Sequence, residues 1–187
     1  HLEDSSQTYV TNGATASNDN AYTDAGAAYV FVRSGTSWTQ QAYLTAPNAG
    51  ASDNFGVTVG ISGNTIVVGA YNEDSTQTYI TNGATASSNN GASTAGAVYV
   101  FVRSGTSWAQ QAYLKASNAA ASDYFGQDVS VSGDTMVVGA HLEDSSQTYV
   151  TNGATASNDN AYTDAGAAYV FVRSGTSWTQ QAYLTAP

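Results

Sequence analysis

The chain has 187 residues, of which 14 are acidic and 4 are basic, so its formal net charge is −10. This acidic balance disfavours binding to nucleic acid or to anionic membranes, because like charges repel. The absence of cysteine excludes disulfides and thiol chemistry. The sequence also lacks the run of about 18 apolar residues that a membrane span requires, so we expect no membrane insertion.

Repeats of 70 residues organise the sequence. The segment FVRSGTSW occurs three times, at Phe31, Phe101 and Phe171. Residues 1–47 recur letter for letter as residues 141–187. Because each repeat of this kind is one structural unit that packs on its neighbours, we divide the chain into a partial repeat and two full repeats. These are residues 1–47, 48–117 and 118–187.

In chain order, the first full repeat contains four strand-like stretches. The first alternates apolar residues with small or polar ones, and the second is apolar on both faces. A tight turn joins the first two, a long polar insertion from Tyr71 to about Ala95 follows, and a second tight turn joins the last two. The expected strands are Phe55–Ile61, Thr65–Ala70, Ala97–Arg103 and Trp108–Leu114.

Four strands joined in this way predict an all-β fold of tandem four-stranded antiparallel blades, each about 70 residues long. Strands that are apolar on both faces must be covered on both sides, which stacking of blades achieves as in a β-propeller. We expect either a partial propeller or an open repeat array. A β-solenoid is the rival architecture, although its coils are usually shorter. Residues 1–47 are expected to supply only two outer strands, with further repeats beyond this chain.

The long insertion carries its own local signal. Asn-Gly recurs at Asn12, Asn82 and Asn152, between Tyr, Val, Ile and Thr residues. Asn-Gly suits a type I′ turn, in which both central residues have positive φ. We therefore expect a small protruding hairpin within each insertion.

Three motifs recur with the repeat: Phe-Gly, Val-Val-Gly-Ala and Gly-Ala-x-Tyr-Val-Phe. They lie at Phe55-Gly56 and Phe125-Gly126, at Val67–Ala70 and Val137–Ala140, and at Gly26–Phe31, Gly96–Phe101 and Gly166–Phe171. The chain thereby resembles the FG-GAP repeat family, most of all its bacterial branch. The resemblance implies β-propellers similar to the head of integrin α subunits. It also implies a calcium loop between the first two strands, but here Ser62–Asn64 and Ser132–Asp134 are too short for six to eight oxygen ligands.

Carboxylates of the insertion are the candidate metal ligands. They are Glu3, Asp4, Glu73, Asp74, Glu143 and Asp144 at the base of the insertion, with Asp19 and Asp159 further along it. Such groups could hold Ca²⁺ and order the loop. The alternative, which we favour, is that they keep the loop soluble or cap turns. We expect no other cofactor, and we expect Asp53 and Asp123 to bond turn amides.

Aromatic and amide side chains are the candidates for contact with a partner. On the insertion these are Tyr9, Asn12, Tyr79, Asn82, Tyr149 and Asn152. On the last strand of each repeat, Trp38, Trp108 and Trp178 could stack on sugars, but packing between blades is the commoner use.

Catalysis finds no support, because the only histidines, His1 and His141, occupy one repeat position without a nucleophile motif. We therefore expect a non-enzymatic extracellular or cell-surface protein with a structural or adhesive role. It would self-associate through repeat stacking or strand edges, and could form a surface filament. The alternative is a ligand-binding module for a surface glycan or a protein.

Overall fold

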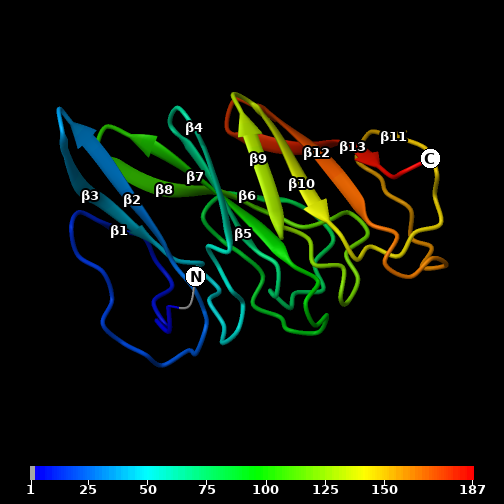
Figure 1. Cartoon of the computed structure of the whole chain (residues 1–187), viewed down its shortest axis with the longest axis horizontal. Coiled ribbons are helices and arrows are strands. Elements are labelled where there is room, and N and C mark those ends of the chain that lie inside the picture. The colour runs from blue at the N-terminus through cyan, green and yellow to red at the C-terminus, as the bar shows by residue number, and fades with distance from the viewer. Residues whose placement is uncertain (1–2) are drawn as a thin grey trace.

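A computed structural model describes residues 3–187, which form an all-β structure without a helix. Three antiparallel sheets stand side by side, with the first and last at opposite ends of the molecule (Figure 1). The first sheet has the order β1-β3-β2, with β1 at Thr11–Asn12, β2 at Ala28–Ser34 and β3 at Ser37–Leu44.

The central and last sheets are complete and have the same topology. The central sheet has the order β4-β5-β7-β8-β6, from Thr58–Ser62, Thr65–Ala70, Ala97–Ser104, Ser107–Leu114 and Thr81–Asn82 respectively. The last sheet has the order β9-β10-β12-β13-β11, from Asp128–Ser132, Thr135–Ala140, Ala167–Ser174, Ser177–Leu184 and Thr151–Asn152. The all-β prediction is thus confirmed, while each complete sheet has a short fifth strand that the sequence did not predict.

Burial along the strands follows their position between neighbouring sheets. All six residues of β5 are buried, because the central sheet is covered on both faces. The equivalent strand β10 has the same kind of sequence, yet its Val137 is exposed where Val67 of β5 is fully buried. The same apolar run is therefore buried on both faces only where a sheet lies on each side of it, as in β5.

The Phe-Gly motif does not begin the first strand, which corrects the expected range Phe55–Ile61. β4 begins only at Thr58. Phe55 instead forms an isolated parallel bridge with Gly26 of the preceding repeat, and Phe125 forms the same bridge with Gly96. The motif is therefore the point at which the chain crosses from one sheet to the next.

At this crossing two backbones approach so closely that no side chain fits between them. A Cβ atom placed on Gly96 would lie 2.0 Å from the carbonyl oxygen of Phe125. Gly96 also has φ +81°, in the left-handed region that glycine adopts without strain. The Phe125 ring is fully buried and packs edge-on against Tyr169 and Phe171 at centroid distances of 5.3 and 6.0 Å. Glycine and phenylalanine thus lock each sheet to its neighbour.

The short strands replace the hairpin that we expected in each insertion. Thr81–Asn82 does not fold back on its own loop; it pairs with the outer strand β8, opposite Tyr113 and Ala112. The backbone N–H of Gly83, the next residue, donates a hydrogen bond to the Gln111 carbonyl oxygen at 2.6 Å. The hairpin prediction is wrong because the exposed edge of β8 offers the segment more backbone partners than a local turn does.

A bulge on the outer strand of the first and central sheets directs a glutamine toward the next sheet. β7 and β8 shift register between Val100 and Phe101, which leaves Gln111 as the extra residue. The Gln111 Oε1 atom accepts a hydrogen bond from Trp178 Nε1 at 3.0 Å. Asn82 forms two hydrogen bonds with Trp178. Its Nδ2 donates to the Trp178 carbonyl oxygen at 3.3 Å, and its Oδ1 accepts from the Trp178 backbone amide at 2.8 Å.

These contacts explain why the three tryptophans differ in exposure. Trp108 and Trp178 are 2% and 0% exposed because a preceding sheet covers each of them, which confirms their predicted role in packing between repeats. Trp38 has the same place in the first sheet, where no preceding sheet covers it, and is 66% exposed. The insertions lie at the end of the sheets opposite the tight turns; in Figure 1 those of the first and central sheets run along the lower edge and that of the last sheet lies at the right.

Gly96→Ala should destabilise the protein far more than Gly105→Ala. Both glycines have positive φ, at +81° and +61°, but an added Cβ meets nothing within 4 Å at Gly105. We expect a loss of about 1–2 kcal/mol for Gly105→Ala from backbone strain alone, and on the order of 4 kcal/mol or more for Gly96→Ala. Urea unfolding followed by tryptophan fluorescence measures both. Equal losses would mean that the crossing does not determine stability.

Candidate functional site

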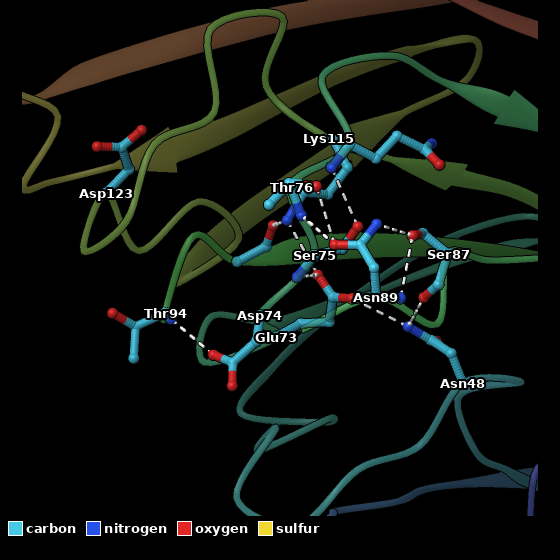
Figure 2. A network of polar contacts seen from close by, with 12 residues as sticks. Asn48, Glu73, Asp74, Ser75, Thr76, Ser87, Asn89, Thr94, Lys115 and Asp123 are labelled. Carbon is cyan, nitrogen blue, oxygen red and sulfur yellow. Dashed lines mark hydrogen bonds and ion pairs between the residues drawn. The ribbon is translucent and has the colours of Figure 1, made fainter. Parts of the chain in front are cut away.

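The glutamate at the base of each insertion is buried and fully bonded. In the central repeat, Glu73 Oε1 accepts a hydrogen bond from Asn48 Nδ2 at 3.0 Å. Its Oε2 accepts from the Ser75 amide at 3.1 Å and forms an ion pair with Lys115 Nζ at 2.9 Å (Figure 2). The carboxylate therefore joins three segments of chain at the root of the loop.

Asn48 was not recognised from the sequence, although it holds this arrangement together. It lies in the linker that leaves the first sheet, and its Nδ2 also donates to the Ser87 carbonyl oxygen at 2.6 Å. Its Oδ1 accepts a hydrogen bond from the Tyr99 hydroxyl at 2.7 Å. The one available signal was an asparagine recurring 70 residues later as Asn118, which makes the same three contacts in the last repeat.

Lys115 distinguishes the central repeat from the other two, which have Thr45 and Thr185 at this position. Its ammonium group is buried and donates a second hydrogen bond, to the Gly96 carbonyl oxygen, at 2.6 Å. Burial lowers the pKa of Lys115, and the neighbouring Glu73 carboxylate opposes that change. In the last repeat the Tyr183 hydroxyl takes the place of the ammonium group and donates to Glu143 at 2.7 Å.

The aspartate that follows each glutamate caps a turn of the insertion. Asp74 Oδ1 accepts a hydrogen bond from the Thr94 amide at 2.7 Å, and Thr94 has φ +53°. Asp4 and Asp144 do the same for Asp24 and Asp164, at 2.9 and 2.8 Å. These bonds stabilise a backbone conformation that is otherwise unfavourable for a residue with a side chain.

Asp19 and Asp159 organise the middle of their insertions. Asp159 accepts hydrogen bonds from the Ser146 amide at 2.9 Å and from the Ser157 hydroxyl, and Asp19 has the equivalent partners. These hydroxyl bonds are the main reason that the pKa of each carboxyl lies below its usual range. Asn89 takes the same position in the central repeat and accepts from the Thr76 amide at 2.8 Å. The amide oxygen of Asn89 accepts the same backbone hydrogen bond as the aspartate carboxylates do, so this hydrogen bond does not require a negative charge.

The candidate metal ligands therefore serve separate parts of the loop. Across residues 3–187, no three His, Asp or Glu side chains gather closely enough to hold a metal ion. In the tight turns where the family resemblance implies calcium, Asn64 Oδ1 accepts from Arg103 Nη2 at 2.7 Å, and Asp134 pairs with Arg173 at 2.6 Å. An arginine thus meets the side-chain oxygen of each turn, which does not fit a calcium site. Calcium binding by the insertion stays an untested prediction.

The contact candidates on the insertions fall into two groups. Asn12 and Asn82 do make contacts, but with the adjacent sheet of the same chain, at Trp108 and Trp178. Tyr9, Tyr79 and Tyr149 are 66%, 65% and 66% exposed.

Of the histidines, His141 packs edge-on against Tyr124 at 5.5 Å, and His1 lies outside the described residues.

Asp53 and Asp123 bond backbone amides, as predicted. Asp53 Oδ2 accepts from the Gly50 amide at 2.8 Å, and Asp123 Oδ2 accepts from the Ala120 amide at 2.7 Å. Both side chains are buried at the linkers between sheets. Desolvation raises the pKa of each carboxyl to about 7, with the Glu73 or Glu143 carboxylate nearby adding to the effect.

Stability should fall as the pH rises from about 4 to about 7. Because the pKa of Asp53 and of Asp123 is higher in the folded than in the unfolded chain, the folded state binds more protons in this range. Each carboxyl can lower the unfolding free energy by up to about 1.4 kcal/mol per pH unit. Asp53→Asn and Asp123→Asn should flatten the slope in urea titrations, whereas the exposed Asp128→Asn should not. An unchanged slope in the first two variants would contradict the assignment.

Glu73→Gln should destabilise the protein by about 3–5 kcal/mol, because it leaves the buried Lys115 ammonium without its counter-charge. Glu143→Gln is the matched control and should cost about 1–2 kcal/mol, since no lysine faces Glu143. The double variant Glu73→Gln/Lys115→Thr should recover most of the loss, because it restores a neutral pairing. The unfolding free energies of the parent, of Glu73→Gln, of Lys115→Thr and of the double variant give the coupling energy between Glu73 and Lys115. If the losses of the two single variants simply add, the two residues are not coupled.

In the described part of the chain, no helix is long and apolar enough to cross a membrane.

No curated protein matches the sequence. The FG-GAP repeat family matches residues 38–101 and 108–171. Each matched segment begins at a tryptophan on the outer strand of one sheet, passes through the Phe-Gly crossing, and ends at a phenylalanine in the next sheet. Since these segments cover more than half of the chain and each contains one Phe-Gly motif, the chain belongs to the FG-GAP repeat family.

Proposed function

We propose that this protein is a non-enzymatic structural and adhesive module, outside the cell or at its surface, whose copies associate head to tail. Repeats of its family are propeller-like, and each sheet would correspond to one blade. The observation that carries the proposal is the exposure, on the first sheet, of aromatic residues that are buried at both internal boundaries. Either a further repeat of the same chain or the association of copies would cover them in the same way, and we propose the association.

The first sheet presents one of the two complementary faces. Phe31 is 51% exposed, while its equivalents Phe101 and Phe171 are fully buried against a preceding sheet. Beside it, a groove of about 400 Å³ runs between β2 and the central sheet, lined by Tyr29, Phe31, Val59, Ile61 and Ile66. β2 is also an edge strand, whereas β7 and β12 pair on both sides. An exposed edge beside an apolar groove can accept strands from another chain.

The last sheet presents the other face. Val137 is 40% exposed on it, and Asn152 stands where Asn12 and Asn82 hold the tryptophan of a following sheet. Asn152 and Trp38 have the identities that each internal boundary uses. Docking of the last sheet of one copy against the first sheet of the next would repeat the asparagine–tryptophan contacts of the outer strands. It would leave Val137 uncovered, because the first sheet has no counterpart of β9, the strand that packs on β5 at the internal boundary. Because the two faces differ, the association is heterologous and produces a filament or a ring.

Self-association should weaken in Trp38→Ala and in Asn152→Ala, because each removes one side of the proposed boundary. Sedimentation velocity over a concentration series measures it, with salt added to screen the charge of −10 on each copy. Tyr79→Ala is the control, since Tyr79 is as exposed as Trp38 but lies away from both terminal faces. A monomer at every concentration and salt, or equal weakening in all three variants, would overturn the proposal.

A second candidate is a module that binds a carbohydrate or protein ligand. The three exposed tyrosines on the insertions favour it, because an exposed aromatic ring with no packing role is a frequent contact residue. This function is compatible with self-association, since the tyrosines and the terminal faces are different surfaces.

A further inference from the structure

Two grooves of the same construction lie at the outer boundaries between neighbouring sheets. One, of about 300 Å³, lies between the central and last sheets and is lined by Tyr79, Ile80, Asn82, Ser117, Trp178 and Gln180. The other, of about 250 Å³, lies between the first and central sheets and is lined by Tyr9, Val10, Asn12, Pro47, Trp108 and Gln110. Each residue of the second set lies 70 positions before its counterpart in the first. The groove is therefore a product of the repeat.

The tyrosine of each groove is held ready by its own loop. Gln77 Nε2 donates hydrogen bonds to the Tyr79 carbonyl oxygen at 2.7 Å and to Thr81 Oγ1 at 3.0 Å. Gln7 makes the same two bonds, to Tyr9 and Thr11, at 2.6 and 3.0 Å. The backbone beneath each exposed ring is thus fixed before any ligand arrives, which lowers the entropic cost of binding.

Polar atoms without partners lie in the walls of both grooves. In the described structure, Gln180 Oε1, Ser117 Oγ and Gln110 Oε1 are buried and have no hydrogen-bond partner. Gln180 is 7% exposed, and its Nε2 donates to the Thr155 carbonyl oxygen at 3.2 Å, so its Oε1 must serve as the acceptor. Gln110 Nε2 is fixed in the same way by the Thr85 carbonyl oxygen at 3.2 Å. A buried acceptor without a donor is unfavourable. Each of these oxygens is closed to solvent in this conformation, so a ligand in the groove can supply the donor only if the side chain turns toward it.

We propose that each groove binds a residue or two of an uncharged carbohydrate, with the tyrosine ring against the sugar face and a hydroxyl group donating to the glutamine oxygen. Ser117 adds a second acceptor in the groove between the central and last sheets, where the other groove has Pro47. This inference rests on the second candidate function and names its ligand class. The grooves offer an aromatic ring, apolar walls and acceptors that need donors, which is the complement of a polyhydroxylated ring. The net charge of −10 disfavours an anionic ligand. A protein ligand is the rival outcome of the test.

The third tyrosine provides a matched internal control. Tyr149 is as exposed as Tyr9, but its sheet has no following sheet in this chain, and neither groove includes it. Binding should therefore involve two sites per chain rather than three. In self-associated protein a third groove would form at the boundary between copies, so the experiment uses protein that is monomeric by sedimentation.

The probes are cellohexaose, maltohexaose, mannohexaose and chitohexaose, each titrated to about 10 mM, so that even a site with a Kd of about 10 mM would be half occupied at the end of the titration. The protein carries Trp38→Phe, so that fluorescence reports only Trp108 and Trp178, which line the grooves. At least one probe should bind with two sites per chain. Tyr9→Ala or Tyr79→Ala should leave one site, the double variant none, and Tyr149→Ala two.

Circular dichroism first checks that each variant is folded. We expect all of them to fold, because the three tyrosines are exposed and their removal leaves the core unchanged. The carbohydrate proposal is overturned if all four probes fail to give a saturable change, or if the double variant binds as the parent does. Saturable binding of an unfolded, neutral peptide with the same dependence on Tyr9 and Tyr79 would assign the grooves to protein ligands instead. None of these outcomes alters the sedimentation result for Trp38→Ala, so the two proposals fail separately.

Discussion

The rest of the structure depends on the close crossing of two backbones at Gly96 and Phe125, and at Gly26 and Phe55. Because the backbones approach with no room for a Cβ atom, each sheet is held at one distance and one orientation from the next. The phenylalanine ring that enters beside the glycine then fills the space between the sheets. This fixed distance between neighbouring sheets determines where all the other contacts between repeats form, from the inner strands to the tryptophans at the outer edge.

The polar network at the base of each insertion is the second consequence of that spacing. Asn48 and Asn118 leave one sheet and reach the glutamate of the next, so the insertion is anchored by the preceding repeat as well as by its own. The central repeat adds Lys115 to a region that otherwise holds buried carboxyl groups, including Asp53 and Asp123. A buried positive charge offsets part of the cost of burying those groups, provided that its partner Glu73 is present.

Both proposed functions follow from the boundary between two sheets. Where the boundary is complete, it buries the tryptophan and leaves a groove beside an exposed tyrosine, as at Tyr79 and Trp178. Where the partner sheet is absent, at Trp38, the same side chains are exposed and available to another copy. Self-association would therefore also create new grooves, so that the number of carbohydrate sites would grow with the length of the assembly.

The sequence by itself determined the repeat, the β-strands, the tight turns and the burial of Trp108 and Trp178, because these depend on local patterns and on a 70-residue period. It did not predict that Phe55 lies outside its strand, or that Thr81–Asn82 would add to β8 rather than form a hairpin. Nor did it reveal Asn48 or the unpartnered Gln180. All four are decided by which backbone edge or side chain of a neighbouring segment lies within reach, and only the tertiary structure brings those segments together.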